Sequence, residues 1–292
     1  MISRVLSAAV SGVDSYIIDV EVDIANGLPS FSVVGLPDAA IRESRDRIKA
    51  AIKNTGFKFP EKRITVNLAP SDIRKEGSGF DLPIAIGILA ASGHVREEVL
   101  PGFVISGQLS LTGDLKSIRG ALPITMSIPA GRAIIFPKTN GREAAVVTDK
   151  DVYALSSLRE VVDFLNGMIT AKPKKVNTET LFRENSSYKV DFSDVKGQEH
   201  VKRGLEVAAS GGHNVLMIGP PGSGKSMLAR RLGTILSEMT LQESLETTKI
   251  HSVSGLLTDK KSIIATRPFR SPHHTISDAA LVGEAPSLPR EK

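Results

Sequence analysis

One eight-residue segment in the second half of the chain has the residue types needed to hold a polyphosphate. Residues 219–226 match the G-x-x-x-x-G-K-[ST] pattern at every fixed position. Glycines let successive backbone N–H groups turn toward phosphate oxygens without obstruction by a Cβ atom, and a following helix presents its positive end. Lys225 supplies a charge for the β- and γ-phosphates, and the Ser226 hydroxyl suits a magnesium ion. The segment predicts binding of ATP with Mg²⁺.

The residues around this segment favour a phosphate-binding loop over a glycine-rich turn that binds nothing. The apolar run 214–218 predicts a buried parallel strand before the loop, and residues 225 to about 236 predict a helix after it. A further helix is predicted over residues 198–209. Strand, loop and helix in this order are the setting that the pattern requires. The predicted binding set comprises Gly219, Pro220, Pro221, Gly222, Ser223, Gly224, Lys225, Ser226 and Met227.

Hydrolysis needs more than this loop, namely an acidic strand end that holds magnesium and an arginine directed at the γ-phosphate. Two apolar runs downstream of Ser226 could supply such a strand. Residues 262–266 contain no acid, and residues 279–284 are interrupted by Gly283. The sequence therefore predicts nucleotide binding and names no catalytic residue, and it leaves hydrolysis open.

The first half of the chain shows the periodicities of a mixed α/β fold. Residues 5–13, 17–24, 63–68, 132–137 and 152–155 predict strands, the first of them in preference to a signal peptide. Residues 38–54 and 82–91 predict helices that end near glycines, and residues 112–114 predict a hairpin turn. Ser157, with Glu160 three residues later, predicts the capped start of a helix that runs to Gly167.

Composition and length limit the possible classes of protein. At 292 residues we expect two compact units: residues 1–169, a polar and basic linker over 170–187, and residues 188–292. The absence of cysteine excludes disulfides and thiolate metal sites and favours a reducing cytoplasm. The apolar stretch 82–95 is too short to cross a bilayer. A net charge of +5 is compatible with a polyanionic partner, but 4% aromatic residues make base stacking unfavoured.

Several further segments carry a family resemblance. Residues 191–198 read DFSDVKGQ, residues 211–214 read GGHN and residues 267–277 read RPFRSPHHTIS, and the N-terminal half contains VVGLPD at 33–38 and NLAP at 67–70. Together with the phosphate loop they resemble the magnesium-chelatase-like AAA+ family of the ComM and YifB type, over essentially the whole chain. The resemblance implies a cytoplasmic, hexameric ATPase associated with DNA helicase and branch-migration activity in natural transformation, and with no membrane contact. It also implies that Val195 and Gln198 lie near the adenine.

The resemblance also gives expectations for what this chain does not contain. Family members continue past the Ser-Pro-His-His segment into an acidic Walker B strand, whereas here Gly283 is followed by EAPSLPREK. We therefore expect this chain to lack Walker B, the sensor residues and the arginine finger. Two functions remain open beside a DNA-remodelling motor: a chelatase-type subunit for metal insertion, and a non-catalytic interaction protein regulated by ATP.

The N-terminal half is similar to the Lon-type protease domain, an α/β fold related to ribosomal protein S5. In our alignment Gly79 stands at the place of the nucleophilic serine and Leu122 at that of the catalytic lysine, so we expect no protease activity. Ser78 with Lys75 or Lys116 is an alternative, less favoured dyad.

The histidine pair at 273 and 274 is a poor metal site, because adjacent side chains diverge and no third ligand is near. With Arg267 and Arg270 the pair predicts either a loop facing nucleic acid or a neighbouring subunit, or a solvated basic turn.

Overall fold

The computed structural model describes residues 1–72, 75–257, 262–273 and 275–276. The chain forms two compact units. Unit 1 comprises Met1–Asn185 and Thr240–Ala265, and unit 2 comprises residues 186–239 together with those from 266 onward.

Unit 1 is built on a seven-stranded sheet with the strand order β3-β4-β2-β1-β5-β8-β9. The antiparallel ladders are β1–β2 and β2–β4, while β3–β4, β1–β5, β5–β8 and β8–β9 are parallel. A separate small hairpin pairs β6 with β7. The strands are β1 Ile2–Ser11, β2 Asp14–Ala25, β3 Ser30–Val34, β4 Arg63–Ala69, β5 Phe103–Ile105, β6 Gln108–Leu109, β7 Leu115–Lys116, β8 Ala133–Pro137 and β9 Val152–Leu155.

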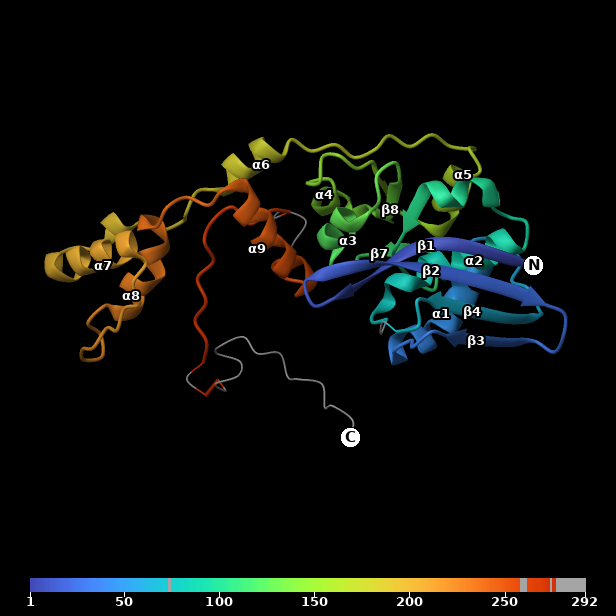
Figure 1. Ribbon diagram of the computed structural model, residues 1–292, viewed down its shortest axis with the longest axis horizontal. Helices are drawn as coiled ribbons and strands as arrows, with labels where there is room; N and C mark the ends of the chain where they lie inside the picture. Colours follow the sequence, from blue (N-terminus) through green and yellow to red (C-terminus); the bar gives the residue numbers. More distant parts are fainter. Residues whose placement is uncertain (73–74, 258–261, 274, 277–292) are drawn as a thin grey trace. The chain divides into compact units, whose positions relative to one another are not determined.

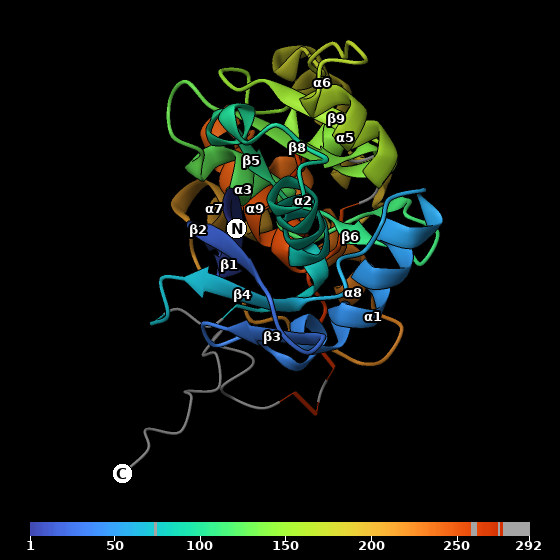
Figure 2. The same cartoon turned by 90° about the vertical axis from the view of Figure 1, so that its right-hand side faces the viewer.

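Helices from distant parts of the chain cover this sheet (Figures 1 and 2). The α-helices of unit 1 are α1 Ala39–Asn54, α2 Asp81–Ala91, α3 Ala121–Ser127, α4 Gly141–Ala144, α5 Leu158–Leu165, α6 Thr178–Asn185 and α9 Leu241–Val253. Its 3₁₀ turns are η1 Ser78–Phe80, η2 Glu97–Gly102 and η3 Lys138–Asn140. The mixed α/β class predicted from the sequence is confirmed.

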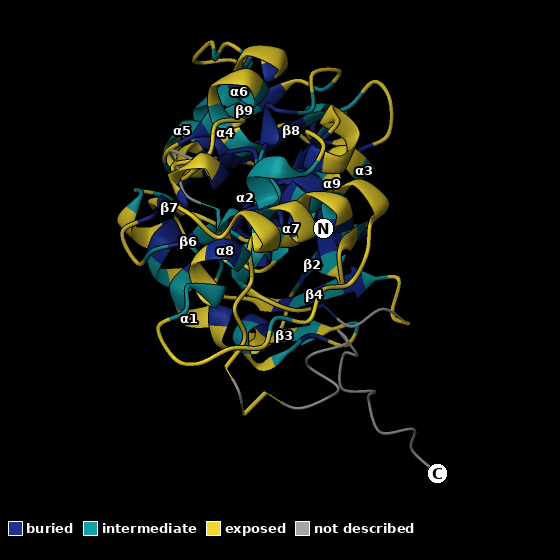
Figure 3. Cartoon of the chain, turned by 90° about the vertical axis from the view of Figure 1, so that its left-hand side faces the viewer, coloured by how far each residue is buried: buried dark blue, intermediate teal, exposed yellow. Residues whose placement is uncertain are grey.

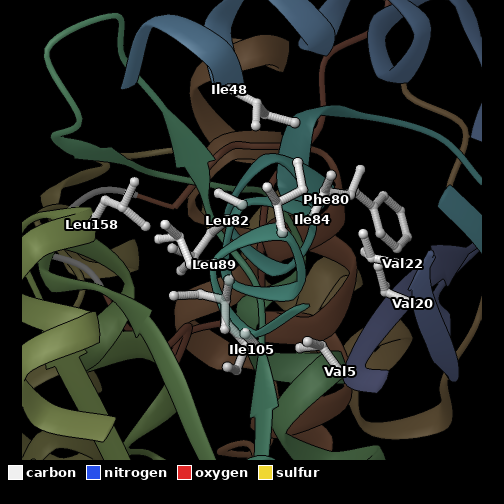
Figure 4. Close-up of a cluster of buried hydrophobic side chains, with 14 of the residues drawn as sticks. Val5, Val20, Val22, Ile48, Phe80, Leu82, Ile84, Leu89, Ile105 and Leu158 are labelled. Atoms are coloured by element: carbon white, nitrogen blue, oxygen red, sulfur yellow. The ribbon is translucent and has the colours of Figure 1, made fainter. Parts of the chain in front are cut away.

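The core of unit 1 is centred on α2, which is buried along its whole length. Its sequence has no polar face, so it can be stable only where neighbours cover all sides. Figure 4 shows Leu82, Ile84 and Leu89 between the β2 side chains Val20 and Val22 on one side and Leu158 of α5 on the other. The helix therefore joins the sheet to the outer helices in one hydrophobic core.

Most elements predicted for the first half are confirmed, because each has a buried apolar face that fixes its register. Helix α1 begins after Asp38, whose carboxylate accepts from the Ile41 N–H at 2.8 Å. Helix α5 begins after Ser157, whose hydroxyl accepts from the Glu160 N–H at 3.2 Å, as the capping pattern predicts. The turn at residues 112–114 lies between β6 and β7.

The compact units differ from the predicted domain boundaries at two places. Residues 178–185, inside the predicted linker, form α6, whose Leu181 is buried with Leu122, Val146 and Ile263 of unit 1. Residues 240–265 also belong to unit 1, although they follow the phosphate loop in sequence. The sequence did not predict α6, because the segment is mostly polar and Leu181 is the one apolar side chain that it buries.

Unit 2 is small and contains η4 Phe192–Asp194, α7 Glu199–Gly211, α8 Lys225–Arg231 and η5 Leu232–Ile235. Its core comprises Phe192, Val195, Leu205 and Leu228. Figure 3 colours much of α7 as exposed. The predicted helices 198–209 and 225–236 are confirmed as α7 and as α8 followed by η5.

The buried strand predicted over residues 214–218 is wrong for this structure. The segment is in no strand pair of the described chain, and the exposed fractions of Leu216 and Ile218 are 85% and 89%. An apolar run can form a buried strand only if a neighbouring strand and a covering helix are present. The described residues of unit 2 provide no neighbouring strand, although Met217 packs against the core to which α7 and α8 contribute.

In the part of the chain that the structure describes, no helix is long and apolar enough to span a membrane.

Candidate functional site

The phosphate loop of unit 2 has the backbone conformation that its glycines predict. Gly222 has a φ angle of 80° and Gly224 of 86°, a region that residues with a Cβ atom seldom adopt. A Cβ atom at Gly222 would meet nothing within 4 Å, so glycine is needed at this position for its backbone conformation and not for lack of space. Gly224 directly precedes α8, so its conformation sets the angle at which the loop enters the helix.

The Lys225 ammonium lies against the oxygens of this loop. It donates to the carbonyl oxygens of Gly219 at 2.7 Å and Pro220 at 2.8 Å, and to the Ser223 hydroxyl at 3.2 Å. Among the residues that the structure describes, no carboxylate forms an ion pair with Lys225, and its partners are neutral oxygens of its own loop. The charge is therefore positioned for an anionic ligand that enters the loop.

Two of the predicted contacts lie next to Gly224, the glycine that precedes α8. The Gln198 side-chain amide donates to the Ser223 carbonyl oxygen at 2.9 Å. A Cβ atom built on Gly224 would lie 3.5 Å from the same amide nitrogen and 3.6 Å from the Met227 methyl carbon. The structure thus brings Gln198 and Met227 to the phosphate loop, although Gln198 is 25 positions away from Ser223 in sequence.

Ser226 and Val195 occupy different environments. Ser226 is the second residue of α8 and is exposed. Val195 is buried in the small core of unit 2 beside Leu228 of α8. Val195 therefore packs against α8, the helix that follows the phosphate loop, and it lies three positions before Gln198 in the sequence.

Sequence reasoning missed the residues that hold these elements together. Asp191 and Asp194 form a reciprocal capping box at η4. The Arg231 guanidinium of α8 donates to the Asp191 carbonyl oxygen at 3.1 Å and lies 3.4 Å from the Asp194 carboxylate. The spacing of two aspartates three positions apart was the available signal, since a capping box has that spacing. The pairing with Arg231 has no local signal.

The basic segment after residue 266 is partly described. The Arg267 guanidinium donates to the Ser237 carbonyl oxygen at 2.8 Å, and its backbone N–H donates to the Tyr188 hydroxyl at 2.9 Å. His273 is paired with the Thr275 hydroxyl at 2.8 Å, whereas His274 lies outside the described residues. No group of three or more metal-ligating side chains occurs among the residues described.

In unit 1, Lys75 of the alternative dyad has another hydrogen-bond partner than Ser78. Lys75 is fully buried, and its ammonium donates to the Pro70 carbonyl oxygen and not to Ser78. Burial lowers the pKa of Lys75, with a smaller opposing effect from Asp72. Leu122, which we aligned with the catalytic lysine in the sequence, is fully buried. No hydrogen bond joins Ser78 to a base among the described residues.

Comparisons with known proteins match both halves of the chain. A family model described as subunit ChlI of Mg-chelatase matches residues 20–140, and a model described as magnesium chelatase, subunit ChlI, matches residues 191–290. The chain is 43% identical over 283 residues to the competence protein ComM of Haemophilus influenzae, covering 96% of this chain and 55% of that protein.

Uncharacterised relatives match equally far. The chain is 43% identical over 284 residues to YifB of Escherichia coli, covering 97% of this chain and 55% of YifB. It is 39% identical over 291 residues to Rv2897c of Mycobacterium tuberculosis, covering 99% of this chain and 57% of that protein. The chain thus spans about half the length of the curated relatives that it matches. Matches to both chelatase-type models and to these relatives over nearly all of its residues show that the chain belongs to the magnesium-chelatase-like family of the ComM and YifB type.

Proposed function

We propose that unit 2 binds ATP with Mg²⁺ through residues 219–226. The observation that carries the proposal is the Lys225 ammonium, held at 2.7–2.8 Å by carbonyl oxygens of a loop whose Gly222 and Gly224 have positive φ angles. A triphosphate supplies charged acceptors that replace these neutral ones, and charge-assisted hydrogen bonds are about twice as strong as neutral ones.

Each residue of the loop has a distinct part in this proposal. Lys225 binds the β- and γ-phosphates, and the exposed Ser226 hydroxyl is a ligand of the magnesium ion. Gln198 holds the Ser223 carbonyl oxygen and thereby keeps the loop open at the side where the purine is expected. The bound magnesium ion neutralises phosphate charge.

Calorimetric titration of ATP and Mg²⁺ into the chain tests this proposal. Binding is expected in the unaltered chain and is expected to vanish in Lys225→Ala, because the charge that faces the phosphates is removed. Lys189→Ala, which removes an exposed lysine of the same unit, is the matched control and should bind as the unaltered chain does. Phosphate release is measured in parallel, and turnover would show that acidic residues for hydrolysis are present. Equal binding by Lys225→Ala and the control would refute the assignment.

The wider role that we propose is that of a cytoplasmic, hexameric AAA+ protein that remodels DNA. Its support is the 43% identity to the competence protein ComM, together with the net charge of +5. The name of the matching family models supports a second candidate, the ATP-driven insertion of a metal into a tetrapyrrole. ATPase activity that rises with DNA in a chain of the relatives' full length supports the first, and dependence on a porphyrin supports the second. Loss of partner binding in Lys225→Ala without measurable turnover would instead indicate a non-catalytic interaction protein.

A further inference from the structure

A hollow lined by cations lies in unit 1, between helix α1 and the edge strand β3. Figures 1 and 2 show α1 beside β3 and β4. Arg45, Lys49 and Lys53 of α1 face this hollow, and Lys62 closes it from the loop that leads into β4. Its remaining lining is Pro29, Ser30, Phe31, Phe59, Pro60 and Glu61.

The sequence of α1 places its three cations in one row. Ile41, Ile48 and Ile52 are buried against the core, which fixes the rotation of the helix about its axis. Arg45, Lys49 and Lys53 follow at intervals of four residues, so they lie along one flank of the helix. Each interval advances about 6 Å along the axis, and the row is about 12 Å long.

These charges are not neutralised within unit 1. Arg45, Lys49, Lys53 and Lys62 are exposed, and none of them is in an ion pair with any residue that the structure describes. Lys49 lies 5.9 Å from the centre of the Phe59 ring, a contact that leaves its charge available. Against the four cations, Glu61 is the acid in the lining of the hollow. The hollow therefore presents a surplus of positive charge.

We infer that this hollow is a binding site for the phosphate backbone of a nucleic acid. A single strand advances about 3.4 Å along the duplex axis per phosphate, so one helical turn of α1 brings a cation to about every second phosphate. The hollow has a volume of about 60 Å³, so the backbone would contact the cations at its rim and would not enter it as a whole. The Phe31 and Phe59 side chains in its lining are half-buried, and charge dominates the remaining lining, so the expected recognition is of the backbone and independent of sequence.

The inference deepens the proposed DNA-remodelling role by naming the surface that contacts DNA, and it rests on that role. It does not rest on the phosphate loop, which lies in unit 2. A structural explanation competes with it, because lysines beside an edge strand protect that strand from pairing with other chains. If the hollow binds DNA, removal of the charges lowers the DNA affinity and its salt dependence. If the lysines only protect the edge strand, removal of the charges increases aggregation alone.

The test measures binding of a fluorescein-labelled DNA duplex by anisotropy over a series of salt concentrations. The triple variant Arg45→Ala, Lys49→Ala, Lys53→Ala is compared with Lys172→Ala, Lys174→Ala, Lys175→Ala, which removes the same charge from another exposed segment. The α1 variant is expected to lose at least about tenfold in affinity, and the slope of log K against log salt should fall by up to about 3, since each phosphate contact contributes roughly 0.9. The control variant should keep both quantities. Circular dichroism checks that both variants fold, which is expected because all the substituted residues are exposed.

Three outcomes would overturn the inference. Equal losses in both triple variants would mean that net charge alone attracts DNA. Unchanged DNA binding by the α1 variant would leave the DNA role standing and remove this surface from it. Absence of duplex binding by the unaltered chain, with binding to phosphatidylserine vesicles in its place, would assign the hollow to a membrane surface and would count against the DNA role as well. Calorimetry with ATP is independent of all three.

Discussion

Glu143 of α4 is a carboxylate with hydrogen-bond partners from three other segments of unit 1. It accepts from the Leu122 N–H at 3.0 Å, from the Ser252 hydroxyl of α9, and from Asn140 at 3.5 Å. Burial raises the pKa of Glu143 above its usual value of 4.5, and the hydrogen bonds from Ser252, Leu122 and Asn140 oppose this only in part. Glu143 thus joins α9 to α3 and α4, and the free-energy cost of burying it depends on whether its carboxyl group is charged.

The sign of this effect gives a prediction for Glu143→Gln. Between pH 4.5 and the raised pKa, the folded chain keeps a proton that the unfolded chain has lost, so this group's contribution to stability decreases as the pH rises through that range. The glutamine does not titrate. Relative to the unaltered chain, Glu143→Gln should therefore be least stable near pH 4 and should gain as the pH is raised to 7.

Thermal unfolding at a series of pH values measures this difference. Glu98→Gln, which alters an exposed glutamate of η2, is the control. A stability difference between Glu143→Gln and the unaltered chain that is constant over the whole pH range would contradict the prediction.

At the scale of elements, two glycines of unit 2 differ in what they contribute. Gly224 has a φ angle of 86° where the loop enters α8, whereas Gly204 lies inside α7, where an added Cβ atom would meet nothing within 4 Å. Alanine at a left-handed position costs about 1–2 kcal/mol, and alanine within a helix gains about 0.5–1 kcal/mol over glycine. Gly224→Ala should destabilise α8 and weaken ATP binding, and Gly204→Ala should stabilise α7. Hydrogen exchange of the α7 and α8 amides measures the two stability effects, and calorimetry measures ATP binding. Faster α7 exchange in Gly204→Ala than in the unaltered chain, or unchanged α8 exchange in Gly224→Ala, would contradict the prediction.

The sequence periodicity predicted those helices and strands that can be recognised without knowing which elements they pack against. The alternation in β2 and β4 and the apolar face of α1 are properties of the segments themselves, and each was found within a few residues of its predicted place. Residues 214–218 show the limit, because their apolar run indicates a strand but cannot supply the strand beside it. In the site, the loop residues were predictable from their spacing, whereas the contact of Gln198 with the Ser223 carbonyl oxygen depends on a turn in which Gln198 itself has a φ angle of 57°.

At the scale of the whole molecule, the predicted fragment 188–292 would separate α9 from its supports. In the chain, Lys249 of α9 lies 2.9 Å from the Asp14 carboxylate, and Ser252 donates to Glu143. The fragment would also keep the exposed Val215, Leu216 and Ile218 without a paired strand. We therefore expect the isolated fragment to melt at a lower temperature than the whole chain, or to aggregate. A soluble fragment with a cooperative melt at the temperature of the whole chain would count against this.

Residues 186–239 are inserted between two parts of unit 1, and this order has a consequence for synthesis. Chains are made from the N-terminus, and domains generally fold as they emerge. The surface of α3 and the buried residues Leu122 and Val146 must wait for α9 and Ile263, which are made only after the phosphate loop. For that interval the nascent chain presents an apolar surface that the finished protein covers, and a ribosome stalled within residues 186–239 would hold unit 1 in a form that chaperones recognise.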